Sequence, residues 1–307
     1  MGKIALLFAG QGSQYPGMGA DIYEHSPAAK AAFDKVEALR PGTMTQCFSG
    51  TKEELSITAN TQPCMFITDY AIAKAVEAQG VSIEGAAGFS LGEIPALAFS
   101  GMLSLEDAFQ LVCYRAEVMH NAAEANPGGM QAVLKLDADT INRLAEGFTD
   151  VFPVNYNSPE QTAVAGNPEQ LKAFAAAVKE AGGRAVPLAV SGAFHSPYMN
   201  TAAEKMAARA ESLAFEAGTL SVYANRTAAP YRVETAKELL ASQVNHPVQW
   251  VKTIQQMIAD GFDCFIEVGP GKTLSGLVKK INTDAKVCKV ENLEDLQALQ
   301  EFLQQCI

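Results

Sequence analysis

Short apolar segments alternate with longer helical patterns along most of the chain, and this alternation constrains the fold more than any other feature. The apolar segments have the length of strands and are IALLFAG at 4–10, AAGFS at 86–90, SVYAN at 221–225, CFIEV at 264–268 and KVCKV at 286–290. The helical patterns cover 64–80, 104–125, 199–213 and 247–261. Strands that alternate with helices in this way are typical of a parallel sheet covered on both faces. We therefore expect an α/β fold.

The segment 128–190 follows a different order. Its patterns predict strands at 130–136, 151–157, 162–166 and 184–190, with helices at 138–147 and 168–182. The resulting order β-α-β-β-α-β is that of a ferredoxin-like α+β unit. We expect this unit as an insert in a larger domain that is formed by 1–127 and 191–307.

Composition narrows the classes of function. The 307 residues are 48% hydrophobic, which is enough for a sizeable core, and the formal net charge of −11 argues against a nucleic-acid partner. No apolar run approaches the roughly 18 residues that span a bilayer, and the apolar start is too short for a signal peptide. We expect a cytoplasmic protein without a membrane partner. The six cysteines are scattered without a CxxC pair, so the sequence indicates neither a disulfide framework nor a thiolate metal site.

The motif GFSLG at 88–92 places a serine between an apolar strand and a helical stretch. In a strand-turn-helix elbow, Gly88 and Gly92 let the backbone turn tightly and leave Ser90 exposed above the sheet. The backbone N–H of Leu91 would then face a tetrahedral oxyanion. GxSxG is only moderately specific, because an ordinary structural turn can carry the same pattern. The flanking strand and helix favour a nucleophilic Ser90.

A nucleophilic serine needs a base, and the chain has four histidines. His25 lies in a polar stretch typical of the surface, His120 falls late in a helical pattern, and His246 precedes Pro247 in an extended segment. His195 stands in SGAFHSPYM, a turn between a strand and a helix, where α/β enzymes collect catalytic side chains. His195 is therefore the favoured base, and a helix-start residue is the alternative interpretation.

Arg115 lies in the apolar context FQLVCYRAEVM. A buried arginine is costly unless an anion meets it, and its planar guanidinium suits a carboxylate. A structural ion pair or a side chain reaching the surface would explain the pattern equally well. Together with a nucleophilic serine, Arg115 indicates an acyl substrate that carries a free carboxylate.

The chain resembles the malonyl-CoA:acyl carrier protein transacylases, the acyltransferases of fatty-acid and polyketide synthesis. The resemblance runs nearly end to end. It rests on FAGQGSQYPGMG at 8–19, GFSLGE at 88–93, the helix of Arg115, GGMQAV at 128–133, NYNSP at 155–159, SGAFHSPYM at 191–199, QVNHPVQW at 243–250 and EVGPGKTL at 267–274. It implies an α/β-hydrolase-like core with a ferredoxin-like insert, which agrees with the strand and helix patterns.

The resemblance also implies roles for residues of this chain. Ser90 would be the nucleophile and His195 its general base and acid, with the backbone carbonyl of Gln243 orienting the imidazole. Gln11 and Leu91 would supply the N–H groups of the oxyanion hole. Arg115 would hold the malonyl carboxylate. The implied reaction is ping-pong transfer of malonyl from malonyl-CoA to the phosphopantetheine thiol of acyl carrier protein, with no metal or redox cofactor.

Two phenylalanines bear on substrate choice. In the resembled family, a phenylalanine before the catalytic histidine accompanies a preference for malonyl, and Phe194 holds that position. Phe89 departs from the family, which usually has histidine directly before the nucleophile. Since the base is assigned to His195, we expect Phe89 to tune the wall of the pocket without abolishing activity.

Three other functions remain open at this point. A polyketide acyltransferase would share every catalytic residue, whereas a hydrolase of uncharged acyl groups would have no use for Arg115. A non-catalytic carrier-binding subunit would not need the complete set of site residues. A local basic patch at Lys272, Lys279 and Lys280 is a candidate for docking the acidic carrier protein, although a solvated helix face explains these lysines equally well.

Overall fold

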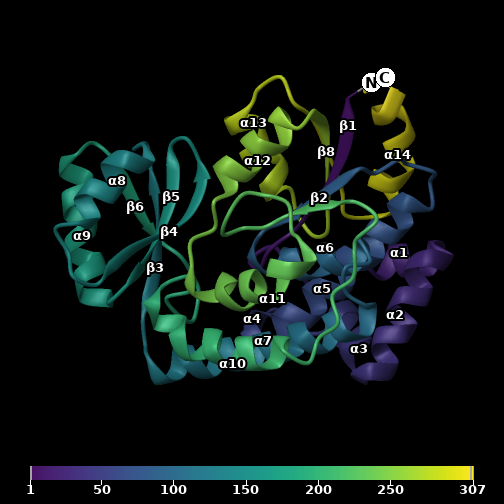
Figure 1. Cartoon of the computed structure of the whole chain (residues 1–307), viewed down its shortest axis with the longest axis horizontal. Helices are drawn as coiled ribbons and strands as arrows, with labels where there is room; N and C mark the ends of the chain where they lie inside the picture. Colours follow the sequence, from purple (N-terminus) through teal and green to yellow (C-terminus); the bar gives the residue numbers. More distant parts are fainter. Residues whose placement is uncertain (1, 305, 307) are drawn as a thin grey trace.

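The computed structural model describes residues 2–304 and 306. It contains a larger α/β unit and a smaller α+β unit that lies beside it (Figure 1). The larger unit is built on a sheet in the order β7-β2-β1-β8-β9, in which every neighbouring pair is parallel. Its strands are β1 (Lys3–Phe8), β2 (Gly85–Gly88), β7 (Ser221–Tyr223), β8 (Phe262–Val268) and β9 (Lys286–Val290). The expected parallel sheet is confirmed.

Helices cover both faces of this sheet, so its strands are apolar on both sides. In β1, Leu6 and Phe8 pack into one hydrophobic cluster, whereas Ala5 and Leu7 pack into another on the opposite face. The second cluster is covered by α12 (Trp250–Ala259) and α13 (Thr273–Ile281). The remaining α-helices of the larger unit are α1 (Ala20–His25), α2 (Pro27–Leu39), α3 (Thr43–Ser49), α4 (Lys52–Ser56), α5 (Thr58–Glu77), α6 (Glu93–Phe99), α7 (Leu105–Ala125), α10 (Asn200–Ala210), α11 (Val233–Ser242) and α14 (Leu293–Gln304).

One helix begins earlier than the sequence pattern predicts. The apolar pattern placed its start at residue 64, directly after a proline, but α5 begins at Thr58 and contains Pro63. Thr61 and Gln62 are polar, yet both are buried. The hydroxyl of Thr61 donates to the backbone carbonyl of Leu55, and the Gln62 Oε1 accepts from Arg115 on α7, so local and tertiary contacts hold the helix through a segment without an apolar pattern.

The smaller unit is an antiparallel sheet in the order β4-β5-β3-β6, with two helices. Its elements are β3 (Gly129–Leu134), α8 (Ala138–Ala145), β4 (Val151–Ser158), β5 (Gln161–Gly166), α9 (Pro168–Glu180) and β6 (Arg184–Pro187). This is the predicted order β-α-β-β-α-β, and the unit has a hydrophobic cluster of its own. The expected fold class is therefore confirmed, while domain boundaries at 128 and 190 stay a prediction.

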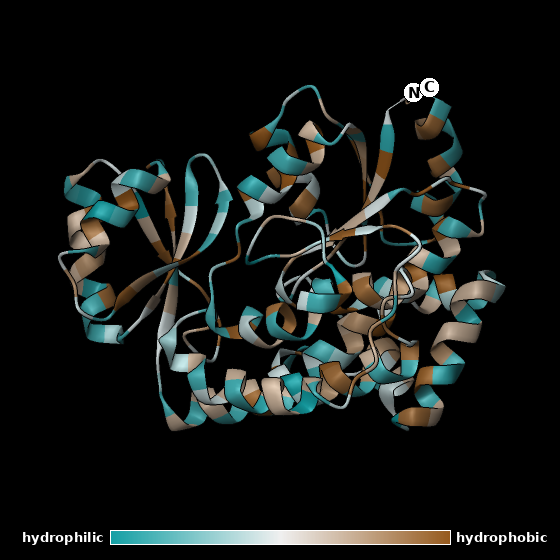
Figure 2. Ribbon diagram, in the orientation of Figure 1, coloured by the Kyte–Doolittle hydropathy of each residue, from teal (hydrophilic) through white to brown (hydrophobic). Residues whose placement is uncertain are grey.

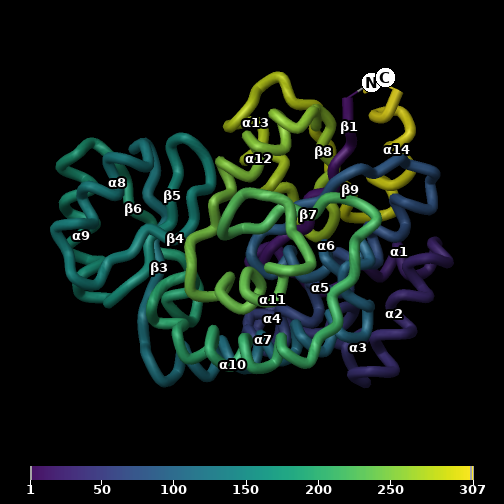
Figure 3. Tube along the Cα trace, viewed as in Figure 1, coloured from purple at the N-terminus to yellow at the C-terminus, as the bar shows by residue number. Residues whose placement is uncertain are grey.

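The insert is joined to the larger unit through β4. The backbone N–H of Tyr156 donates to the carbonyl of Val248, and the N–H of Val248 donates to the carbonyl of Val154. Farther along, the Tyr198 hydroxyl donates to the Asp150 carboxylate at 2.6 Å. In Figure 3 the chain leaves the larger unit, forms the insert and then returns. The segments before and after the insert thus both contribute to the five-stranded sheet, and the insert packs against α12 and α13.

Hydrophobic and hydrophilic residues alternate along most helices, as Figure 2 shows. Among the described helices, none has the length and apolar character needed to cross a bilayer. The expected cytoplasmic location stays a prediction. All six cysteines are free thiols.

Candidate active site

The serine motif forms a sharp turn between β2 and a short 3₁₀ helix, η1 (Ser90–Gly92), which α6 follows directly. Ser90 has φ of 53°, a left-handed conformation that is costly for a residue with a side chain. A Cβ on Gly88 would lie 1.9 Å from the backbone of Gly92, and one on Gly92 would lie 2.3 Å from the carbonyl oxygen of Phe8. Only glycine fits at these two positions, so the glycines permit the close backbone approach on which the turn depends.

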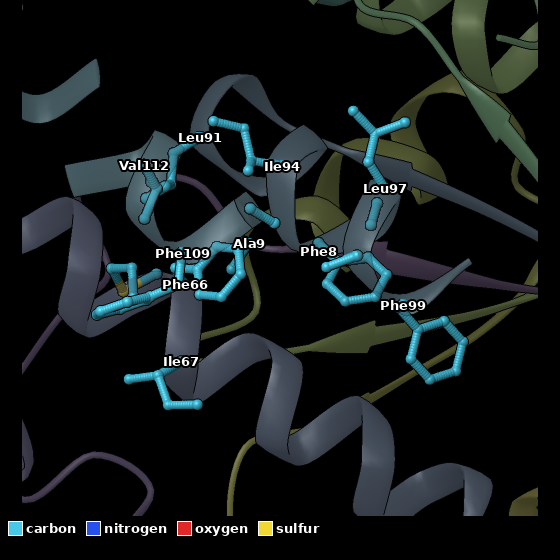
Figure 4. Packing of buried hydrophobic residues seen from close by; sticks show 14 of the residues in the cluster. Phe8, Ala9, Phe66, Ile67, Leu91, Ile94, Leu97, Phe99, Phe109 and Val112 are labelled. Atoms are coloured by element: carbon cyan, nitrogen blue, oxygen red, sulfur yellow. The ribbon is translucent and has the colours of Figure 1, made fainter. Parts of the chain in front are cut away.

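The turn rests on packed apolar side chains. Leu91 is buried in the same cluster as Ile94 and Val112 (Figure 4). Beneath them, the Phe66 and Phe109 rings have their centroids 5.6 Å apart. Because protein interiors pack densely, this support restricts movement of the turn and holds the strained residue in place.

His195 lies directly above the serine. Its Nε2 is 2.7 Å from the Ser90 Oγ, and its Nδ1 lies 2.9 Å from the Gln243 carbonyl and 3.2 Å from the His246 carbonyl. Because carbonyl oxygens only accept, Nδ1 carries the proton and Nε2 is left to accept from the serine hydroxyl. His195 also has a left-handed backbone, with φ of 60°. Both members of this pair are therefore held in strained conformations.

The surroundings keep His195 neutral. Burial, together with the nearby positive charge of Arg115, lowers the pKa of His195 to about 4, and the two backbone carbonyls only partly oppose this shift. An imidazole with this pKa is unprotonated at neutral pH. It can therefore accept the proton of Ser90.

The side chain of Arg115 reaches this pair from the middle of α7. Its guanidinium is buried and donates to the Ser90 Oγ at 3.1 Å and to the Gln62 Oε1 at 2.8 Å. Two further N–H groups donate to the Gln243 Oε1, at 2.8 and 3.3 Å. Within residues 2–304 and 306, no carboxylate forms a salt bridge with Arg115. Burial lowers the pKa of Arg115 to about 10, so the group stays positively charged at neutral pH.

Glu93, like Gln62, is a supporting residue that sequence reasoning missed. Its carboxylate is 1% exposed and accepts from the Tyr231 hydroxyl, the Gln243 Nε2 and the backbone N–H of Asn225. Burial raises the pKa of Glu93 to about 7, against the lowering effect of these donors and of Arg115. Its position directly after GxSxG is the one signal that could have singled it out.

Asn225 is another supporting residue that sequence reasoning missed. Its Oδ1 accepts from the backbone N–H of Ser90 at 2.7 Å, and its Nδ2 donates to the Gly88 carbonyl at 2.6 Å. Asn225 thus bridges both sides of the turn. It follows β7, the strand that pairs with β2, which explains how a residue 135 positions away reaches Ser90.

A cavity of about 130 Å³ opens beside these groups. Seven of the sequence-predicted site residues line it: Gln11, Phe89, Ser90, Leu91, Arg115, Phe194 and His195. Gln243, the eighth, contributes its backbone carbonyl to His195 and its side chain to Arg115. All eight predicted site residues therefore gather around one cavity.

A second cavity of about 290 Å³ continues from the first toward the insert. The two share Gln11, Phe89, Asn155 and Leu188. The second cavity lies between the GQGS loop at 10–13, the insert and α13. The cavity beside Ser90 therefore adjoins a larger one next to the insert.

The two histidines that the sequence analysis set aside, His25 and His120, and the three candidate docking lysines lie elsewhere. His25 is exposed at the end of α1, and His120 lies near Glu124 on α7. Lys272, Lys279 and Lys280 are exposed on or beside α13. Their role in docking stays a prediction.

Comparisons with known proteins agree with this geometry. The family model described as "Acyl transferase domain" matches residues 5–300. The malonyl CoA-acyl carrier protein transacylase of Bacillus subtilis is 39% identical over 305 residues, which cover 97% of this chain and 96% of the relative. A crystal structure of the transacylase of the same name from Clostridium perfringens superposes with a TM-score of 0.95, at 36% identity, over 99% of this chain and 98% of the other.

A further solved structure is a complex. It is described as a type II PKS acyl-carrier protein together with its malonyl-transacylase. The matched chain has a TM-score of 0.92 and 32% identity, covering 97% of this chain and 99% of its own length.

Proposed function

The chain belongs to the acyl transferase domain family, and on this premise we propose that it transfers the malonyl group from malonyl-CoA to acyl carrier protein for fatty-acid synthesis. The resemblance inferred from the sequence motifs is confirmed by relatives that match over nearly the whole chain. The observation that carries the proposal is that the Ser90 Oγ lies within hydrogen-bond distance of both His195 and Arg115.

In the first half of the proposed reaction, His195 Nε2 takes the hydroxyl proton as the Ser90 Oγ attacks the thioester carbonyl. The N–H groups of Leu91 and Gln11 stabilise the negative oxygen of the tetrahedral intermediate. When the intermediate collapses, the C–S bond breaks and the imidazolium returns its proton to the departing CoA thiolate. Malonyl then remains on Ser90 as an ester.

In the second half, the phosphopantetheine thiol of the carrier enters through the second cavity. His195 takes the thiol proton, the sulfur attacks the ester carbonyl, and collapse of the second intermediate returns the proton to the Ser90 Oγ. The two halves use the same groups in opposite order, so the kinetics are ping-pong. The proposed chemistry uses only residues of the chain and requires no metal or redox cofactor.

Arg115 provides the selectivity for malonyl. Its guanidinium already donates to the Ser90 Oγ, so it lies where the free carboxylate of a bound malonyl group arrives. The carboxylate supplies the anion that a buried arginine otherwise lacks. The Phe194 ring lines the same cavity and crowds a methyl branch on the acyl group. Such a contact is worth about 1–3 kcal/mol, which gives a preference for malonyl over methylmalonyl.

Intact-mass measurement tests the proposal. The protein is mixed with malonyl-CoA, and we expect a mass increase of one malonyl group that is absent in Ser90→Ala. Adding holo acyl carrier protein should return the enzyme to its original mass and move malonyl to the carrier. An unmodified wild-type protein would refute the transferase. Rapid loss of malonyl to water without a carrier would instead indicate the hydrolase, and a panel of fatty-acid and polyketide carriers distinguishes the two pathways.

A further inference from the structure

Gln243 is the residue through which the catalytic groups are connected. Its backbone carbonyl accepts from His195 Nδ1, and its side-chain Oε1 accepts from two N–H groups of Arg115. Its Nε2 donates to the Ser90 carbonyl at 2.6 Å and to the Glu93 carboxylate at 2.8 Å. The side chain thus lies between a guanidinium that only donates and two oxygens that accept.

This arrangement requires one orientation of the Gln243 amide. Rotating the amide by half a turn would place its NH₂ against the Arg115 guanidinium and its oxygen against the Ser90 carbonyl. Each contact would then join two donors or two acceptors, which is costly for groups buried away from water. The two acceptors of the Gln243 NH₂ group, the Ser90 carbonyl and the Glu93 carboxylate, both favour the observed orientation. Of these two acceptors, the Glu93 carboxylate is the one on a side chain.

Glu93 has hydrogen-bond partners on both of its carboxylate oxygens. The backbone N–H of Asn225 donates to the same oxygen that accepts from Gln243, and Tyr231 donates to the other oxygen. The carboxyl group is buried, and it lies at the start of α6, directly after the serine turn. The turn that positions the nucleophile therefore also fixes the acceptor that orients Gln243.

We propose that Glu93 is a positioning residue that fixes the side-chain amide of Gln243 and, through it, holds the Arg115 guanidinium at the acyl carboxylate. This inference rests on the proposed function and deepens it. Glu93 touches neither the substrate nor the reacting atoms. Its effect is specific to acyl groups that carry a carboxylate, because Arg115 is the residue that it positions.

Glu93→Met tests the proposal, since it keeps the length of the side chain and removes the acceptor. The measurement is the second-order rate constant for acylation of Ser90 by malonyl-CoA and by acetyl-CoA, obtained by rapid quench and intact mass. A misplacement of about 1 Å in a binding group can cost 100-fold. We expect the malonyl-to-acetyl ratio to fall at least tenfold, mainly through a higher KM for malonyl-CoA.

The conservative variant and a matched control separate positioning from general stability. Glu93→Gln retains an oxygen that accepts from Gln243, so we expect it to restore the ratio to within about threefold of wild type. Tyr231→Phe removes the donor to the other Glu93 oxygen and leaves the Gln243 and Asn225 contacts in place. It should lower the urea midpoint without changing the ratio.

A second route remains informative if Glu93→Met does not fold. Gln243→Met keeps the backbone carbonyl for His195 but breaks the link from Glu93 to Arg115, so it should lower the ratio by itself. An unchanged ratio in a folded Gln243→Met protein would show that Glu93 does not act on Arg115 through the Gln243 amide.

Three results would overturn the inference while leaving the proposed function intact: an unchanged ratio in a folded Glu93→Met protein, a glutamine variant no better than the methionine variant, or an equal fall of the ratio in Tyr231→Phe. Failure of the wild-type protein to accept malonyl would instead contradict the proposed function. The two failures are therefore distinguishable.

Discussion

Two buried carboxyl groups in this molecule have contrasting surroundings. Glu93 accepts from donors on three other residues beneath the serine turn. Asp69, on α5, is also fully buried, but neither of its oxygens has a hydrogen-bond partner in the part of the chain that the structure describes. Burial raises the pKa of both groups, and at Asp69 the negative charge of Glu267 raises it further.

The comparison separates two reasons for burying an acid. Glu93 lies in a network with Gln243 and Arg115, where each polar atom fixes another, and such a network specifies a geometry. The Asp69 Oδ1 lies close to Gly269, where a Cβ would come within 2.0 Å of it. A buried carboxyl without a donor destabilises the ionised form. We infer that the first arrangement supports chemistry, whereas the second affects stability alone.

The largest expected effect comes from removing the base that the network orients. His195→Ala should slow acylation of Ser90 by about 10²- to 10⁴-fold, the usual contribution of a general base. Because the pKa of His195 is lowered to about 4, the imidazole is the neutral, proton-accepting form above that pH. Wild-type acylation should therefore lose activity on the acid side near pH 4. Because burial also raises the pKa of Glu93 to about 7, a limb near 6.5 would contradict this assignment if it persists in the rapid-quench pH profile of Glu93→Gln.

Removing the guanidinium tests the other end of the network. Arg115→Ala should lower malonyl acylation by about 10- to 100-fold, since hydrogen bonds to charged groups contribute about 1.5–3 kcal/mol. Acetyl acylation should change by less than about threefold, because acetyl has no carboxylate to bind. Arg143→Ala, at an exposed position on α8, is the matched control and should leave both rates unchanged. An equal loss of both rates in Arg115→Ala would remove its role in selectivity.

His195 and Arg115, which these two predictions change, were already indicated by the sequence, and so was Ser90. The reason is physical. Ser90 depends on local backbone geometry, so glycines on both sides and a flanking strand and helix reveal it. His195 was found by eliminating three histidines in less suitable contexts. The sequence indicated the candidate catalytic residues because a strained turn and a buried base require particular neighbours along the chain.

The supporting network could not be predicted in the same way. Glu93 and Gln243 meet across 150 positions, and the orientation of an amide leaves no trace in residue spacing. In the sequence, Glu93 looks like an ordinary acid in the first turn of a helix. The burial of Asp69 was equally hidden, because it depends on how α5 packs against the segment after β8. Both depend on tertiary packing, which also determined where α5 begins.

The next largest effect is the pH dependence that Asp69 gives to the free energy of unfolding. Its pKa in the folded protein is raised, so between the unfolded and folded pKa values the native state retains a proton that the unfolded state releases. The free energy of unfolding therefore falls as pH rises, by up to about 1.4 kcal/mol for each pH unit. Asp69→Asn removes this dependence. Its stability relative to wild type, measured by urea unfolding, should increase from pH 5 to pH 7.

The same variant tests whether Asp69 is separate from the chemistry. Acylation by malonyl-CoA should stay within about twofold of wild type, because Asp69 contacts no group of the Glu93 network. A large loss of acylation in a stable Asp69→Asn protein would show that Asp69, like Glu93, affects the reaction and not stability alone. Parallel pH dependence of stability in the variant and the wild type would show that Asp69 is not the titrating group.

The smallest expected effect is at Phe89, which is next to the nucleophile in sequence but belongs with the packing residues. Its ring meets Trp250 edge to face, with centroids 5.4 Å apart. Phe89→His should lower stability by about 0.5–1.5 kcal/mol through the loss of this aromatic contact. Acylation should change by less than about threefold, because the ring supplies no hydrogen bond to Ser90 or His195.

Phe148→His is the matched control for this last prediction, since the Phe148 ring meets Phe174 in the same edge-to-face manner, with centroids 5.4 Å apart, inside the insert. Both variants should show a similar loss in urea unfolding. If acylation falls tenfold in Phe89→His alone, the ring must contact the acyl group or the pantetheine arm, because it lines both cavities. Phe89 would then contact the substrate. The histidine that the resembled family usually has at this position would differ from Phe89 in its substrate contact rather than in its packing.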